Sequence, residues 1–265
     1  MRIISITSGK GGVGKTTLIA NAALKLAQKG KKVLILDGDL GMANVDIAFG
    51  LKTEFSIHDV LMGRKELKDI IVEVAKNVFL IPGGSGIVEL SHLNHFERRA
   101  IVDMASSLPF QFDYLLIDTA PGISENVLYL NAAAQSVVMV VTPDPASFAD
   151  SYALIKVLHQ RHKINRVLMV CNQVKDEADG MRLYQRFNEV VGRFLNVGLS
   201  YIGSVPMDQA LRSANHMQRL VVRQDPGAIS AQAISNLVPE FDRYNRELGF
   251  KSGMQGFWEQ VVGVA

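Results

Sequence analysis

The sequence predicts an α/β fold in which a doubly wound, mostly parallel sheet is flanked by helices. Strand-like apolar runs alternate with helical segments along the whole chain, and most of these runs are rich in Val, Ile and Leu. A glycine-rich loop also joins the first expected strand to the first expected helix. Strands are expected at residues 3–7, 32–37, 77–81, 114–118, 136–142, 166–171 and 201–205.

The length of 265 residues allows one large domain or two small ones, and we expect one, at residues 1–248, followed by a tail at 249–265. A formal net charge of +2 gives no support for direct nucleic-acid binding. The single cysteine, Cys171, excludes a disulfide framework and is expected in a buried strand. No apolar stretch reaches the roughly 18 residues that cross a bilayer. We therefore expect a cytoplasmic protein.

The loop after the first strand has the spacing of a phosphate-binding P-loop. It runs from Gly9 to Thr16 and opens a helix that is expected to end before Gly30. The glycines let backbone N–H groups turn toward phosphate oxygens, Lys15 supplies a catalytic positive charge for the β and γ phosphates, and the Thr16 hydroxyl is a Mg²⁺ ligand. The sequence therefore predicts a P-loop NTPase whose nucleotide contacts are Gly11, Gly12, Val13, Gly14, Lys15, Thr16 and Thr17.

Two acidic residues at strand ends fit the remaining chemistry. Asp118 ends one strand and leads into a turn that reaches Gly122, which indicates a Walker B carboxylate that binds Mg²⁺, followed by a turn that senses the γ phosphate. Asp39 follows the second strand at the same expected sheet edge, and it is a candidate for binding the metal and for orienting or activating the attacking water. An acid that only forms a turn is the alternative at each position.

A second lysine inside the loop, Lys10, extends the match. The run from Lys10 to Thr17 resembles the deviant Walker A motif of the MinD/ParA family, and the resemblance covers nearly the whole chain. Residues 37–46 are similar to the switch I of that family, and residues 118–122 to its switch II. The resemblance implies an ATP-dependent homodimer in which Lys10, as a catalytic residue, reaches the nucleotide of the partner subunit. A solvated loop lysine is the alternative.

The resemblance also implies contacts with the adenine base. Asn172 follows one expected strand, and Pro206 and Asp208 follow another, at places where members of the family contact adenine. An Asn or Asp at a strand exit is more often a turn or helix-cap residue, so both interpretations stay open.

Within the family, three runs resemble the flagellar-number regulators of the FlhG/FleN group. They are residues 40–46, 82–86 and 142–156. That resemblance implies control of flagellar number and placement through a signal-recognition-type (SRP-type) GTPase, a basal-body component or a transcriptional activator. Many members carry an N-terminal extension that stimulates the GTPase, whereas here the expected first strand begins close to Met1. Which partner is used therefore stays open.

The tail carries an apolar stripe with the period of an amphipathic helix. Its members are Met254, Phe257, Trp258, Val261, Val262 and Ala265. Such a short helix needs a surface to bury its stripe, either a membrane, as in MinD-like proteins, or a groove on its own domain. We predict reversible, ATP-dependent binding to the inner face of the cell membrane, although Lys251 is the one basic residue nearby.

Other functions remain possible for a chain of this type. A MinD-like division-site ATPase and a ParA-like partition ATPase share the loop, and a nucleotide-gated module could sequester a transcription factor with negligible turnover. Partition ATPases need exposed basic residues for DNA, which the low net charge does not favour. Slow intrinsic hydrolysis is expected of the switch.

Overall fold

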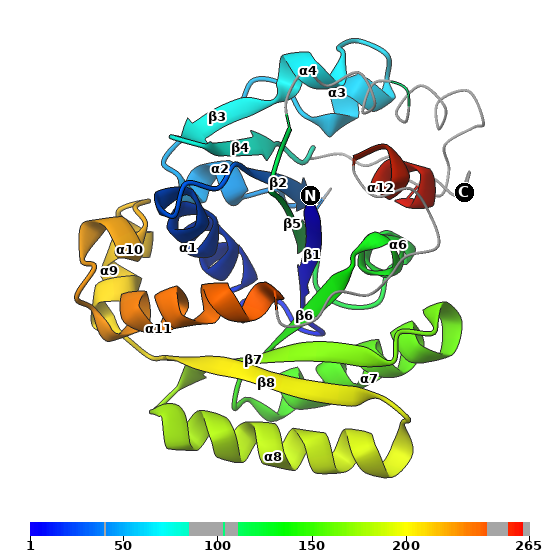
Figure 1. Cartoon of the computed structure of the whole chain (residues 1–265), viewed down its shortest axis with the longest axis vertical. Coiled ribbons are helices and arrows are strands. Elements are labelled where there is room, and N and C mark those ends of the chain that lie inside the picture. The colour runs from blue at the N-terminus through cyan, green and yellow to red at the C-terminus, as the bar shows by residue number, and fades with distance from the viewer. Residues whose placement is uncertain (40, 85–102, 104–110, 243–253, 262–265) are drawn as a thin grey trace.

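A single sheet forms the centre of the molecule and confirms the expected α/β class (Figure 1). The computed structural model describes residues 1–39, 41–84, 103, 111–242 and 254–261, and in these the sheet has eight strands in the order β3-β4-β2-β5-β1-β6-β7-β8. Neighbouring strands pair in parallel except β3 and β4, which are antiparallel. The strands are β1 (Arg2–Thr7), β2 (Val33–Gly38), β3 (Val72–Ala75), β4 (Val78–Ile81), β5 (Tyr114–Thr119), β6 (Ser136–Val141), β7 (Arg166–Val174) and β8 (Gly198–Pro206).

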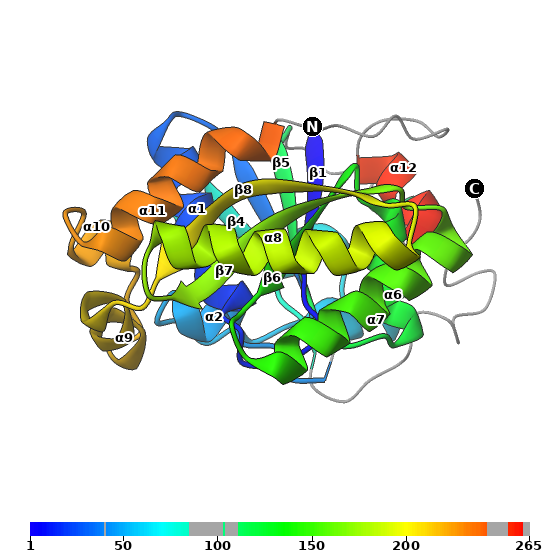
Figure 2. The same cartoon turned by 90° about the horizontal axis from the view of Figure 1, so that it is seen from below.

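Helices cover both faces of this sheet (Figure 2). One face carries α1 (Lys15–Gln28), α2 (Val45–Ala48), α9 (Gln209–His216), α10 (Val221–Gln224), α11 (Ile229–Leu237) and the 3-10 helix η2 (Val238–Asp242). The opposite face carries α3 (Ile57–Leu61), α4 (Leu67–Ile70), α6 (Glu125–Ala133), α7 (Pro145–His162), α8 (Glu177–Phe194) and α12 (Met254–Val261).

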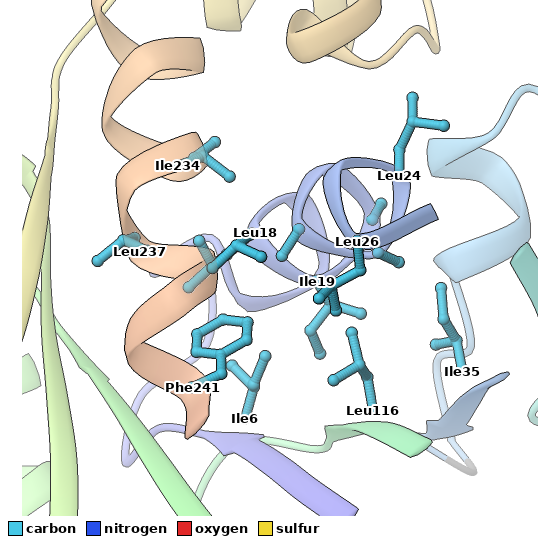
Figure 3. Packing of buried hydrophobic residues seen from close by; sticks show 14 of the residues in the cluster. Ile6, Leu18, Ile19, Leu24, Leu26, Ile35, Leu116, Ile234, Leu237 and Phe241 are labelled. Atoms are coloured by element: carbon cyan, nitrogen blue, oxygen red, sulfur yellow. The ribbon is translucent and has the colours of Figure 1, made fainter. Parts of the chain in front are cut away.

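Burial on both faces explains why the central strands are almost continuously apolar. In β2, Val33 and Ile35 point to the face of α1, while Leu34 and Leu36 point to the face of α6 and α12. Figure 3 shows the first face from close by, where Phe241 of η2 lies over the sheet beside α1 and α11. The phosphate loop thus leaves β1 at the middle of a rigid, two-sided core.

The seven strands expected from the sequence are all present, and the structure adds one. The additional strand, β3, has four residues at the outer edge of the sheet, and its Glu73 is exposed. A short edge strand buries little, so it lacks the apolar pattern that identified the others. The first helix ends at Gln28, and Gly30 follows with a φ of 81°, the left-handed conformation expected after the helix.

The C-terminal helix α12 is docked on its own domain. Phe257, Trp258 and Val261 are at most 3% exposed and belong to the cluster that α12 forms with α3, α6 and the sheet. A groove on the domain was one of the two surfaces that the sequence left open. Residues 249–253 and 262–265 lie outside the described part of the chain, as do Leu40 and residues 85–86 of the runs named above. Membrane binding stays a prediction.

Candidate nucleotide site

Side chains from outside the loop hold the P-loop backbone in shape. Ser8 Oγ donates to the carbonyl of Lys10 at 2.7 Å, Gln173 Nε2 to that of Gly12 at 3.2 Å, and Asn172 Nδ2 to that of Val13 at 2.6 Å. In a trans peptide the carbonyl and the following N–H point in opposite directions. The N–H groups that follow these three carbonyls therefore point away from the tethering side chains. This is the arrangement that a phosphate requires.

The loop lysine Lys15 lies at the centre of a charge cluster. Its Nζ donates to Ser8 Oγ at 2.8 Å, and the residue is 7% exposed. Burial lowers the pKa of the Lys15 ammonium, while the negative charges of Asp118 and Asp39 oppose that shift. The structure thus brings together the lysine and the two carboxylates that the sequence predicted. Ser8 was not predicted, because its contact with Lys15 arises only when the loop closes.

Thr16 and Asp118 form a pair that suits a hard cation. Thr16 Oγ1 donates to Asp118 Oδ2 at 2.6 Å. Asp118 Oδ1 is buried and has no hydrogen-bond partner among the described residues. Burial raises the pKa of Asp118 to about 6, against the opposing effects of Thr16 and Lys15. A free carboxylate oxygen beside a hydroxyl supplies the oxygen ligands that Mg²⁺ prefers, so these residues fit the metal.

The segment expected to be switch I, residues 37–46, is held by two acids with different environments. Asp39 is half-buried, and its Oδ1 accepts bonds from the N–H groups of Gly41 and Met42. Asp37 is 1% exposed, and its Oδ2 accepts from the N–H groups of Asn44 and Val45, at the start of α2. The sequence singled out Asp39 and missed this role of Asp37. The sequence does show an acid two positions before Asp39, at Asp37. Which of the two acids is buried depends on where β2 ends, which the sequence pattern does not specify.

The environment of Asp37 predicts a pH dependence of stability. Burial, and then the charge of Asp118, raise the pKa of Asp37 from 3.8 to about 7, although three backbone N–H groups oppose the shift. The folded state therefore favours the protonated form. The contribution of Asp37 to the free energy of unfolding is complete below 3.8 and is lost as the pH rises through about 7.

We expect the metal-free protein to lose stability over this pH interval and the Asp37→Asn variant to lose less. The variant should keep part of the dependence of unfolding free energy on pH, because the pKa of Asp118, about 6, lies in the same interval. Urea unfolding at a series of pH values measures both profiles. Glu189→Gln, at an exposed position of α8, is the control and should match the parent profile. Parallel profiles for the parent and Asp37→Asn would contradict the assignment.

The signature lysine Lys10 is paired within its own chain. Its Nζ forms an ion pair with Asp144 Oδ2, and both side chains are about two-fifths exposed. Asp144 Oδ1 also caps α7 through the N–H of Ala146, and the bond with Lys10 lowers the pKa of Asp144. This contact joins residues 134 positions apart, and no local pattern in the sequence predicts it.

Of the three adenine candidates, Asn172 contacts the phosphate loop, whereas Asp208 is hydrogen-bonded to other elements. The Asn172 side chain is 8% exposed, and its Nδ2 holds Val13. Asp208 Oδ1 caps α9 through the N–H of Ala210, and its Oδ2 accepts from the N–H and Oγ of Ser230. Partial burial raises the pKa of Asp208, but these bonds outweigh it and lower the pKa overall. Asp208 thus acts as a helix cap, one of the two interpretations that the sequence left open. Contacts of Asn172, Pro206 and Asp208 with the adenine base stay predictions.

The structure also bears on the single cysteine, on metal clusters other than the nucleotide site, and on helices that could cross a membrane. Cys171 is fully buried, and its pKa is raised to about 12 by burial, so its thiol is not a nucleophile near neutral pH. Within the described ranges, no group of three or more His, Cys, Asp or Glu side chains could hold a metal ion by itself. None of the described helices has the length and hydropathy needed to cross a membrane.

Comparison with known proteins places this site in a family. A family model described as an AAA domain matches residues 1–170. The solved structure of the septum site-determining protein MinD from Pyrococcus horikoshii, complexed with Mg-ADP, is similar with a TM-score of 0.71 and 29% identity, covering 91% of this chain and 96% of that one. The antiactivator FleN of Pseudomonas aeruginosa is 35% identical over 262 residues, or 99% of this chain and 94% of FleN. This chain belongs to the MinD/ParA family of ATPases.

Within the MinD/ParA family the chain is close to the FlhG/FleN group. The flagellum site-determining protein YlxH of Helicobacter pylori is 32% identical over 267 residues, which cover 98% of this chain and 90% of YlxH. The resemblance first seen at Lys10 and at the switch regions is therefore confirmed at the level of the family. As a MinD/ParA ATPase, the protein hydrolyses ATP, and the cluster of Lys15, Thr16 and Asp118 is its candidate nucleotide and Mg²⁺ site.

Proposed function

We propose that this ATPase is a nucleotide-operated dimerisation switch that regulates flagellar number or placement. The observation that carries the proposal is Lys10, which lies on the exposed rim of the P-loop and has an acid of its own chain as its ion-pair partner. Such a contact can be exchanged for another anion at little cost, because water and salt screen an exposed ion pair and it contributes little to stability. The names of two relatives, an antiactivator and a flagellum site-determining protein, support the flagellar role.

Each residue of the site has a defined task in the proposed cycle. Lys15 and the inward N–H groups bind the β and γ phosphates, and Asp39 orients a water molecule toward the γ phosphorus. Attack by this water breaks the bond to the β-phosphate oxygen and yields ADP and inorganic phosphate. Mg²⁺ held by Thr16 and Asp118 would supply positive charge to the phosphate oxygens. In the dimer, Lys10 leaves Asp144 and binds the nucleotide of the partner subunit.

Light-scattering mass tests the switch. With Mg²⁺ and ADP the protein should be a monomer, and with Mg²⁺ and a nonhydrolysable ATP analogue a dimer. The Lys10→Ala variant should stay monomeric in both, because it lacks the charge that crosses the interface. Asp39→Ala is the matched control, which should dimerise and yet hydrolyse ATP roughly a hundredfold more slowly. A Lys10→Ala dimer, or a mass indifferent to nucleotide, would refute the switch.

Protein partners and a membrane complete the proposal. The dimer presents a surface to a partner in flagellar assembly, for which an SRP-type GTPase, a basal-body component and a transcriptional activator are the candidates. The name of the antiactivator FleN favours the activator. When α12 leaves its groove, its apolar stripe becomes free to bind a membrane. Phe257 and Trp258 are large aromatic side chains of the kind that interfacial helices insert among lipid headgroups.

Liposome partitioning tests the membrane step. With the ATP analogue the full chain should sediment with anionic liposomes, and a chain ending at Lys251 should not, since it lacks the apolar stripe. With ADP neither should sediment. Equal partitioning of the two chains would mean that α12 serves only its own domain.

A further inference from the structure

A second cavity lies apart from the phosphate loop, between the elements that follow it. Its volume is about 460 Å³, within the range of sites that hold ligands. It is open to solvent and is lined by α1, by the end of α2, by the edge strand β3, by the segment that joins α9 to α10 and by α10, which lie on the same side of the molecule in Figure 1. Its lining residues are Leu24, Ala48, Phe49, Val74, Ala75, Gln218, Arg219, Leu220, Arg223 and Gln224.

The cavity is lined by buried apolar side chains, Leu24 and Leu220, which we call its floor, and by two exposed arginines. Leu24, Phe49 and Leu220 are among its apolar side chains, and none of its lining residues is acidic. Arg219 and Arg223 are exposed, and neither forms an ion pair within the described part of the chain. The polar contact of Arg219 is a 3.3 Å bond from its Nη1 to Gln224 Oε1. Two guanidinium groups therefore line the same cavity as these apolar side chains, and no carboxylate of the described residues is paired with either.

We propose that this cavity binds an acidic segment of a protein partner. A bulky apolar side chain of that segment lies on the floor, and carboxylates on either side of it bind Arg219 and Arg223. The guanidinium fork matches a carboxylate through two parallel hydrogen bonds. Arginines four residues apart suit two carboxylates that flank one apolar residue, which a peptide supplies. The inference gives the proposed switch a partner site, and it rests on that function only for its dependence on nucleotide.

Residues near the cavity lining are hydrogen-bonded to α1, the helix that the phosphate loop opens. Asn215 Nδ2 of α9 donates to Thr17 Oγ1 of α1 at 3.2 Å, and the N–H of Val222 in α10 donates to Asn21 Oδ1 of α1 at 3.1 Å. On the other side, Asp37 holds the N-terminus of α2, and the wall residues Ala48 and Phe49 lie at the end of that helix. A shift of residues 37–46 on ATP binding would therefore move the wall at Ala48 and Phe49 relative to the others.

A peptide titration of the nucleotide-free full chain tests the cavity. The probe is a pentapeptide with blocked ends, a central phenylalanine and two glutamates on each side. Its binding is followed by nuclear magnetic resonance of the backbone amides of the protein. We expect saturable shifts at Phe49 and at residues 220–224, with a Kd on the order of 1 mM. The double variant Arg219→Glu, Arg223→Glu should weaken binding at least roughly tenfold, since each contact involves a charged hydrogen bond.

Three controls separate this site from general attraction between charges. Arg186→Glu with Arg193→Glu changes the net charge equally at exposed positions of α8 and should leave the affinity unchanged. A peptide with glycine in place of phenylalanine, and one with lysine in place of glutamate, should not bind. Three results would each overturn the proposal. The two double variants could weaken binding equally, the glycine peptide could bind as well as the phenylalanine peptide, or no saturable shifts could be seen.

The nucleotide dependence is tested separately. The titration is repeated with Mg²⁺ and ADP and with Mg²⁺ and the ATP analogue, and the two affinities should differ at least roughly fivefold, the lower limit of ordinary coupling between sites. Equal affinities would overturn the coupling. Because the first titration uses no nucleotide, a failure of the cavity and a failure of the dimerisation switch give different results.

Discussion

The Gly9→Ala variant is expected to lose the closed P-loop and with it the binding of nucleotide. A Cβ at this position would lie 2.1 Å from the carbonyl carbon of Asp150 and 2.4 Å from the nitrogen of Ser151, both in the backbone of α7. Backbone atoms of a helix cannot rotate away, so the loop or the helix must move. We expect a loss of about 3 kcal/mol or more in the free energy of unfolding.

Gly11→Ala is the matched control for this prediction. Its Cβ would lie 3.7 Å from Pro121 Cγ, an ordinary contact, and its stability should stay within about 1 kcal/mol of the parent. Urea unfolding of both variants without nucleotide measures the difference, and a titration with fluorescent ADP reports the loop. A Gly9→Ala protein as stable as Gly11→Ala would show that the contact with α7 is not needed for folding.

Replacing Trp258 with alanine is expected to release α12 from its groove. Trp258 is 1% exposed and packs edge-on against Phe257, with ring centroids 5.2 Å apart. Deleting a buried aromatic side chain costs about 3–5 kcal/mol. Here the loss is limited to the free energy of docking, because a helix that detaches as a unit leaves the rest of the domain folded. We therefore expect a loss near the lower end, about 3 kcal/mol.

A chain that ends at Lys251 provides the comparison, since it lacks α12 altogether. If Trp258→Ala detaches the helix, both proteins should unfold at the same urea concentration, below that of the parent. Gln260→Ala, on the half-buried side of α12, should unfold like the parent. Wild-type stability for Trp258→Ala would contradict the docking, and so would a shortened chain as stable as the parent. Because Trp258 is the only tryptophan in the sequence, its emission in the parent also reports the docked helix.

Local patterns in the sequence were sufficient for seven of the eight described strands, all but the edge strand β3, and for the phosphate loop. The central strands are buried on both faces, so their apolar runs stand out without knowledge of their neighbours. The loop from Gly9 to Thr16 has a spacing set by the geometry of a phosphate. Asp39 follows β2 and Asp118 lies near the end of β5, and these two strands pair up to their carboxyl ends. These residues were identified because each signal spans only a few positions.

The tertiary structure alone decided how the loop is held and where the last helix lies. Asn172 and Gln173 tether carbonyls about 160 positions earlier in the chain, and Lys10 pairs with Asp144 across 134 positions. An amphipathic stripe specifies that a helix must bury one face, but it does not specify the surface that covers it. The groove that receives Trp258 is made by α3, α6 and the sheet, and it exists only after these elements have packed. Contacts between distant residues depend on the arrangement of the whole fold, which no short stretch of sequence contains.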